Sequence, residues 1–278
     1  MLRLRRSKTA AVDGGARTLP LARWLIGALA ALALAFLILP IFGLIGVAVS
    51  SQAWDEAPAL AIVQAIVLSF ATTSITALVT VILGTPLAYV FARWRFPLRR
   101  LLNILIELPI VLPPAVAGLG LLVTLGRRGV FGGELYALGI SLPFTTAAVV
   151  VAQTFVSAPF YVRSAQVGFQ GVPREIEDAA RVDGASSFTL FRRITLPLAS
   201  RSLIAGLVLS WARALGEFGA TVLFAGSLQG RTQTMPLLIY NIFDSDINAA
   251  VWAGVILVGM ALLALLISMW LRRDDTLT

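Results

Sequence analysis

The sequence predicts an all-α integral membrane protein. Three observations support this class: 58% of the 278 residues are hydrophobic, only 13% are charged, and the mean hydropathy is +0.89. Soluble domains carry about 25% charged residues. Apolar runs of about 20 residues, the length that a helix needs to cross a bilayer, recur along the chain. No succession of short segments with alternating polarity indicates a membrane β-barrel.

Six stretches are long enough to cross the membrane, and we expect helices because lipid-exposed backbone must satisfy its own hydrogen bonds. They are residues 24–49, 63–92, 101–125, 143–162, 203–225 and 247–271. The first run exceeds the roughly 7 to 15 apolar residues of a signal peptide, so we interpret it as a membrane helix. The expected organisation is a basic tail (1–22), one transmembrane domain (23–271) and a short C-terminus (272–278).

The distribution of Lys and Arg predicts that both termini are cytoplasmic. With the N-terminus inside, most of the 22 cations fall in inner segments, and the outer connections hold only Arg127, Arg128 and Arg231. This bias follows the positive-inside rule. The net charge of +8 is spread over separate inner segments, which argues against a nucleic-acid surface. We therefore expect a multi-pass protein of the plasma membrane, the inner membrane in a Gram-negative cell.

The absence of Cys and His narrows the range of catalytic and metal-binding chemistry that the chain can perform. It removes thiol catalysis, disulfides, histidine-ligated metals and histidine bases. The phosphate-binding pattern G-x-x-x-x-G-K-[ST] is also absent, so the chain is not a P-loop ATPase by itself. We expect a non-catalytic protein without cofactor or metal, whose energy comes from an ion gradient or from a partner.

The longest polar segment, EDAARVDGASSFTLFRRITLP, covers residues 177–197, between the fourth and fifth stretches. Pro173 at a first helical position, acids in the first turn and Gly184 at the end predict a short helix over 173–183. A serine at 186 or 187 can cap a second short helix. A solvated, salt-bridged loop is the simpler interpretation, since exposed charge runs usually do no more.

The order of residue types in this segment resembles the coupling motif of ABC importer permeases. The pattern is an acid and two alanines, then glycine after three residues, then Ile-x-Leu-Pro after nine; the family usually has Glu at the position of Asp178. The resemblance implies that the segment between spans four and five docks on a separate cytoplasmic ATPase subunit. The residues assigned to this coupling helix and its continuation are Glu177, Asp178, Ala179, Ala180, Gly184, Ile194, Leu196 and Pro197.

Three further stretches are similar to the molybdate branch of the molybdate and sulfate permeases: residues 107–122, 213–226 and 230–240. The resemblance covers about residues 61–271. It implies a homodimer with two ATPase subunits and a periplasmic or lipid-anchored anion-binding protein, importing molybdate with tungstate as a related cargo. A sulfate or thiosulfate importer is the alternative.

Two features of the spans are candidates for the pathway. Prolines in the third stretch predict either a kink or a broken helix that lines the path. Arg213 and Glu217 lie four residues apart within the fifth, where an unpaired charge is costly. They form either a mutual ion pair, pairs across a dimer axis, or an attractor for an oxyanion at Arg213 held in place by Glu217. The pathway or gate candidates are Glu107, Pro109, Pro113, Pro114, Arg213 and Glu217.

Candidates on the outer side are Arg127, Arg128, Arg231, Thr232 and Gln233. The three arginines either contact acidic groups of the binding protein or lie at lipid headgroups. A gradient-driven secondary transporter is a distant alternative, in which intramembrane acids relay protons or sodium. The coupling motif and the lack of an inverted repeat count against it.

Overall fold

The computed structural model describes residues 20–55 and 57–273, with side chains described between 23 and 266 except at 56. Every regular element in these ranges is a helix, which confirms the all-α class. Of the expected basic tail (1–22), residues 1–19 lie outside the described residues. Of the expected C-terminal segment (272–278), residues 274–278 lie outside them.

The chain divides into two units, residues 1–46 and 47–278. Most of α1 (Pro20–Ser50) belongs to the first. Its apolar side chains are spread around the whole helix, as in a helix that faces lipid on all sides. This is the expected first stretch, and residues 23–50 are long and apolar enough to cross a membrane.

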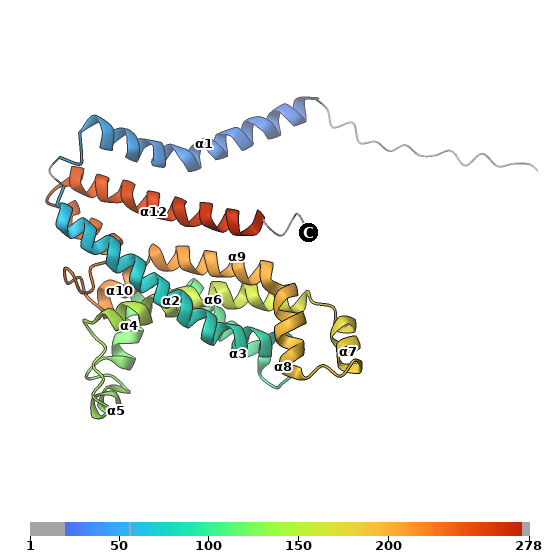
Figure 1. Cartoon of the computed structure of the whole chain (residues 1–278). Helices are drawn as coiled ribbons and strands as arrows, with labels where there is room; N and C mark the ends of the chain where they lie inside the picture. The colour runs from blue at the N-terminus through green and yellow to red at the C-terminus, as the bar shows by residue number, and fades with distance from the viewer. Residues whose placement is uncertain (1–19, 56, 274–278) are drawn as a thin grey trace, which may run out of the picture. The chain divides into compact units, whose positions relative to one another are not determined.

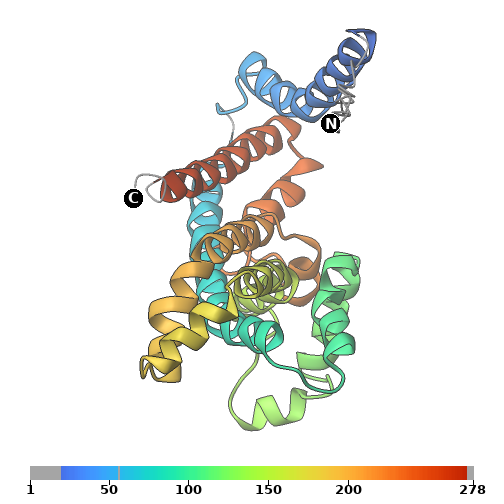
Figure 2. The same cartoon turned by 90° about the vertical axis from the view of Figure 1, so that its right-hand side faces the viewer.

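The second unit is built around three long helices, α2 (Ala59–Arg93), α6 (Thr146–Gln170) and α9 (Leu196–Leu215). The most extensive packing in this unit joins α6 to α9 and to α2; in Figure 2 the yellow-green α6 lies beside both helices. Small residues permit the close approach of α6 and α9: a Cβ at Gly206 would lie 2.5 Å from the Cβ of Ser164. Such small-residue contacts are typical of helix pairs in membranes.

The unit also contains two shorter helices, α5 (Gly132–Ala137) and α11 (Met235–Phe243), and the long helix α12 (Ile247–Arg273). α12 packs on α11 and α9. In Figure 1, α7 (Arg174–Val182) and α8 (Ser187–Leu190) lie at one end of the helices, and α5 lies toward the other.

The third expected stretch is a broken helix and not a simple kink. It consists of α3 (Arg99–Val111) and α4 (Pro114–Leu125), which differ in direction by 115°. Leu112 and Pro113 each precede a proline and take extended conformations, with ψ of 133° and 131°. A residue before proline is disfavoured in the helical region, so consecutive prolines explain the break. Pro109, by contrast, lies within α3.

The fifth expected stretch, 203–225, has different bounds in the structure. Helical structure runs from Ser187 through a π-helical segment, η1 (Phe191–Thr195), into α9 and ends at Leu215. After a break, α10 (Gly219–Phe224) begins. The carboxylate of Glu217 accepts a hydrogen bond from the N–H of Ala220 at 2.8 Å, which satisfies a donor that a helix start leaves unpaired. No proline marks this break, although Gly216 and Gly219 flank Glu217 there.

Four helices in the described residues are long and apolar enough to cross a membrane, or five if the bent pair is one span, against the six stretches expected. The difference includes α6, the fourth expected stretch. Its polar side chains Gln153, Ser157 and Gln166 are buried among other helices. Since α6 packs against protein on several sides, it does not need the apolarity of a lipid-facing helix.

Candidate functional site

A protruding segment, residues 173–190, is called the knob here. It comprises α7, a turn at Gly184 and α8. The first expected short helix agrees closely with α7, whereas the second is not separate and continues through η1 into α9. Gly184 has φ of +86°, a conformation that costs other residues energy, and a Cβ there would meet nothing within 4 Å. The side chain of Ser186 caps α8 by accepting from the N–H of Thr189 at 3.2 Å. Conformation, and not space, therefore explains the glycine.

The outward surface of the knob carries both charge and apolar area. Asp178 is exposed and pairs with Arg181 at 2.7 Å. Val182 and Phe188 are 88% and 71% exposed. Large apolar side chains that are exposed on a polar segment are typical of a surface that another protein covers. Ala179 is also exposed and Ala180 half-buried, so these small residues leave room for a partner to approach.

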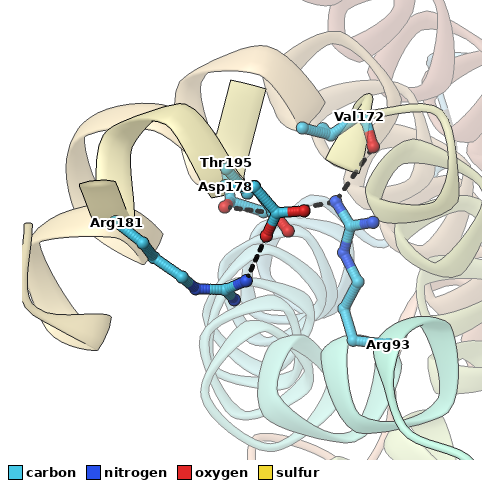
Figure 3. Close-up of polar contacts among 6 residues, drawn as sticks. Arg93, Val172, Asp178, Arg181 and Thr195 are labelled. Carbon is cyan, nitrogen blue, oxygen red and sulfur yellow. Dashed lines mark hydrogen bonds and ion pairs between the residues drawn. The ribbon is translucent and has the colours of Figure 1, made fainter. Parts of the chain in front are cut away.

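Glu177 does not share this outward surface. It is only 4% exposed, and its carboxylate lies 2.8 Å from the guanidinium of Arg93 at the end of α2. The hydroxyl of Thr195 donates to the same carboxylate at 2.7 Å, and Arg93 also donates to the carbonyl of Val172 at 3.1 Å. Figure 3 shows Arg93, Thr195 and Val172 gathered at this point. Glu177 is therefore not placed to contact a docking partner directly, whereas the exposed Asp178 is.

The remaining motif residues lie where the knob joins the bundle. Leu196 packs against the buried cluster around Tyr161 and Phe169. Ile194 belongs to η1 and is half-buried, and Pro197 is exposed in the first turn of α9. A π-helical turn is rare and often marks a functional position. Here it ends at Thr195, which donates to Glu177.

The broken helices α4 and α10 meet backbone to backbone. A Cβ at Gly118 would lie 2.7 Å from the carbonyl oxygen of Ala220, and one at Gly219 would lie 2.6 Å from the Cβ of Pro114. The prolines of the third stretch and the break after α9 therefore belong to one structural feature, the α4–α10 crossing. The sequence did not indicate this contact.

Arg213 and Glu217 border the break that precedes α10. They form an ion pair within one chain at 2.7 Å, the first of the three arrangements considered. The Glu217 side chain is 1% exposed and that of Arg213 is 29% exposed. Glu217 thus holds both the arginine and the start of α10, while the Arg213 side chain remains partly exposed.

Glu107 belongs to a separate polar group. It pairs with Arg163 of α6 at 3.3 Å, and both side chains are well exposed, at 43% and 58%. One turn earlier on α3, Asn103 accepts a hydrogen bond from Gln166 at 3.1 Å. The α3–α6 contact therefore carries a polar stripe, defined here as Asn103, Glu107, Arg163 and Gln166.

The expected outer residues divide into two groups. Arg127, Arg128 and Arg231 are exposed, and Arg127 lies over the ring of Tyr136 at 5.8 Å. Thr232 and Gln233 are buried, at 0% and 8% exposure. The Thr232 hydroxyl accepts from the N–H of Leu228 at 2.9 Å, so these two residues hold the shape of their loop from inside.

The family model described as "Binding-protein-dependent transport system inner membrane component" matches residues 81–273. The chain belongs to this family. The match begins within α2 and includes the knob, the α4–α10 crossing and α12. The sequence resemblance to permeases is thereby confirmed, and the permease is a multi-pass membrane protein.

Relatives of the permease carry more specific names. It is 47% identical over 202 residues to the molybdenum transport system permease protein ModB of Mycobacterium tuberculosis, which covers 73% of this chain and 76% of that protein. ModB of Escherichia coli K12 is 39% identical, with 76% and 93% covered. The probable transport system permease protein NifC of Clostridium pasteurianum is 41% identical, with 77% and 75% covered.

Solved structures place the permease in the fold of ABC transporter membrane subunits. A bacterial alginate ABC transporter in complex with its alginate-bound periplasmic protein aligns with a TM-score of 0.72 at 18% identity, covering 92% of this chain and 96% of that one. The MetNI methionine transporter aligns with a TM-score of 0.60 at 19% identity, covering 77% and 95%. At these identities the likeness concerns the fold alone.

Proposed function

We propose that the chain is the membrane-spanning subunit of an ATP-driven importer that moves molybdate into the cytoplasm. The observation that carries this proposal is the high identity, 39% to 47%, to permeases named for molybdenum transport. Tungstate, which has the same charge and tetrahedral shape, is a related cargo. ATP hydrolysis belongs to a separate subunit, so the chain itself is non-catalytic.

The proposed orientation places the knob in the cytoplasm, with both termini on the same side, a transmembrane domain over 23–271 and its permease core over 61–271. The excess of Lys and Arg on that side supports it. In this arrangement Val182 and Phe188 enter a groove of the ATPase subunit, with Asp178 at the rim. A second copy of the chain completes a two-fold pathway, and one ATPase subunit binds each of the two knobs. A periplasmic or lipid-anchored protein delivers the anion on the opposite side of the membrane.

The proposed pathway includes the α4–α10 crossing. Arg213 there presents a guanidinium that is partly accessible, while Glu217 orients it and offsets part of its charge. A single arginine held in this way attracts a dianion without binding it tightly. A path must release what it attracts, and most selectivity therefore lies in the binding protein. Arg127, Arg128 and Arg231 are proposed contacts for that protein.

Uptake of labelled molybdate into proteoliposomes tests the function. The vesicles contain the permease, its ATPase subunit and its binding protein, with sulfate or tungstate as competitor. We expect uptake that requires ATP, persists in excess sulfate and falls in excess tungstate. Loss of uptake in sulfate would assign the sulfate or thiosulfate cargo instead. Uptake by the permease alone, driven by an ion gradient, would contradict the ATP-driven class.

A further inference from the structure

The ion pair between Arg93 and Glu177 is enclosed to an unusual degree for a surface segment. The two side chains are 9% and 5% exposed. The neighbouring pair in the same knob, Asp178 and Arg181, has the shorter distance of 2.7 Å but side chains that are 66% and 56% exposed. A charge taken out of water is costly unless it is paired and hydrogen-bonded. A largely buried arginine at the end of α2 therefore pairs with the knob.

This pair joins four segments that are distant in sequence. Arg93 is the last residue of α2, and Glu177 lies 84 residues later in α7. Val172 belongs to the link between α6 and α7, and Thr195 ends η1 just before α9. Within the knob, α7 packs mainly on its neighbour α8, whereas α8 continues into η1 and α9 and buries Leu190. The position of α7 relative to α2 thus depends mainly on these side-chain bonds.

Stability alone is a poor explanation for such a pair. Well-packed apolar residues are often as stabilising as a buried ion pair, whereas loss of one partner leaves an uncompensated charge. The Nε of Arg93 is also buried without a hydrogen-bond partner among the described residues. An ion pair in which one buried N–H has no hydrogen-bond partner is poorly suited to maximising the stability of the fold. Its directional bonds are better suited to fixing the position of α7 relative to α2.

We infer that Arg93 is a positioning residue for energy coupling. With Glu177 and Thr195 it forms a latch, a name used here for these three residues, that makes α7 move together with the ends of α2 and α9. The inference rests on the proposed function, in which an ATPase subunit moves the knob. The exposed residues of α7 receive the movement, and the latch transmits it to α2, a helix with no place in the coupling motif.

The first test measures the anion transported per ATP hydrolysed, in the complete transporter in proteoliposomes. Arg93→Met and Glu177→Gln are compared with Arg95→Met, which removes an exposed arginine two residues away in the same connection. We expect a fall of about fivefold or more for the latch variants, because coupling energies of 1 to 3 kcal/mol correspond to such factors, and no change for Arg95→Met. The exchanged pair, Arg93→Glu with Glu177→Arg, restores part of the ratio. A ratio equal to that of the unmodified transporter in both latch variants would overturn the inference.

The second test does not depend on the cargo. Hydrogen exchange of residues 174–182 is followed in the full-length permease in lipid nanodiscs, because amides that lose their local support exchange faster. We expect faster exchange in Arg93→Met and unchanged exchange in Arg95→Met. Equal protection in Arg93→Met and the unmodified chain would refute the latch. If the unmodified transporter takes up no molybdate while Arg93→Met loses protection, the proposed cargo fails and the latch stands.

Discussion

At the scale of single residues, two adjacent acids of one motif have different surroundings. Asp178 is exposed and paired within its own helix turn, whereas Glu177 is buried against α2. The sequence assigned both to the same docking contact, because helical periodicity alone does not show which side of a short helix meets the bundle. Local features were predictable in part: the proline, the acids and Gly184 predicted α7 to within one residue at each end, but the second short helix is continuous with η1 and α9. The partner of Glu177, 84 residues away, had no signal in the sequence.

Gly184→Val provides a test of the knob turn. Valine in the left-handed region costs at least about 1 to 2 kcal/mol, so the turn opens and α8 shifts relative to α7. We expect less ATPase subunit to copurify with the permease and uptake to fall in proportion. Gly139→Val is the matched control, because Gly139 has φ of +74°, equally open space, and a place outside the knob. Equal losses in both variants would mean that general destabilisation, and not docking, explains the effect.

A thermodynamic cycle at Arg213 and Glu217 tests whether the pair acts as a unit. Arg213→Met leaves a buried carboxylate unpaired, and such losses cost about 3 to 5 kcal/mol. We expect the double variant Arg213→Met with Glu217→Met to unfold at a higher temperature than Arg213→Met alone, measured by thermal denaturation in detergent. Additive losses would indicate that the two residues stabilise the protein independently.

At the scale of elements, the sequence located apolar helices well and their interruptions poorly. The prolines predicted an irregularity in the third stretch but left kink and break open. The fifth stretch has no proline at its break, and Gly216, Glu217 and Gly219 alone did not predict that the helix ends there. The two interruptions meet at the α4–α10 crossing, and only the three-dimensional arrangement shows that they form one feature.

The double variant Pro113→Ala with Pro114→Ala tests the crossing. Without prolines, Leu112 is free to adopt helical angles, so α3 and α4 become more nearly continuous and α4 withdraws from α10. We expect uptake to fall several-fold while the protein remains folded by circular dichroism. Pro86→Ala, within α2, is the control for removing a proline from a membrane helix. Unchanged uptake in the double variant would show that the bend has no part in transport.

At the scale of the whole molecule, the exposed ion pair of the polar stripe implies that part of the surface does not face lipid. Charged residues within membrane helices are normally turned toward water or protein, yet Glu107 and Arg163 are 43% and 58% exposed in the single chain. A second copy facing this stripe would enclose a wet passage between the two. We therefore predict that two copies assemble around this stripe.

The absence of native cysteine makes this passage testable. In the assembled transporter, we expect Glu107→Cys to react with a charged, membrane-impermeant maleimide, and ATP to alter the rate. Leu262→Cys, at an exposed apolar position of α12, serves as the lipid-facing control and should react slowly. Similar rates at both positions would contradict a water-filled path along the stripe.

The buried polar side of α6 has a consequence for how the protein is made. Gln153 accepts a hydrogen bond from α2, and Gln166 donates one to α3; both of these helices are synthesised before α6. The side of α6 that faces α9 is covered by a helix that leaves the ribosome later. The membrane insertion machinery must therefore retain α6, or shield it from lipid, until α9 arrives. Biogenesis of this chain is thus not a sequence of independent insertions: its central helix is completed by a segment translated after it.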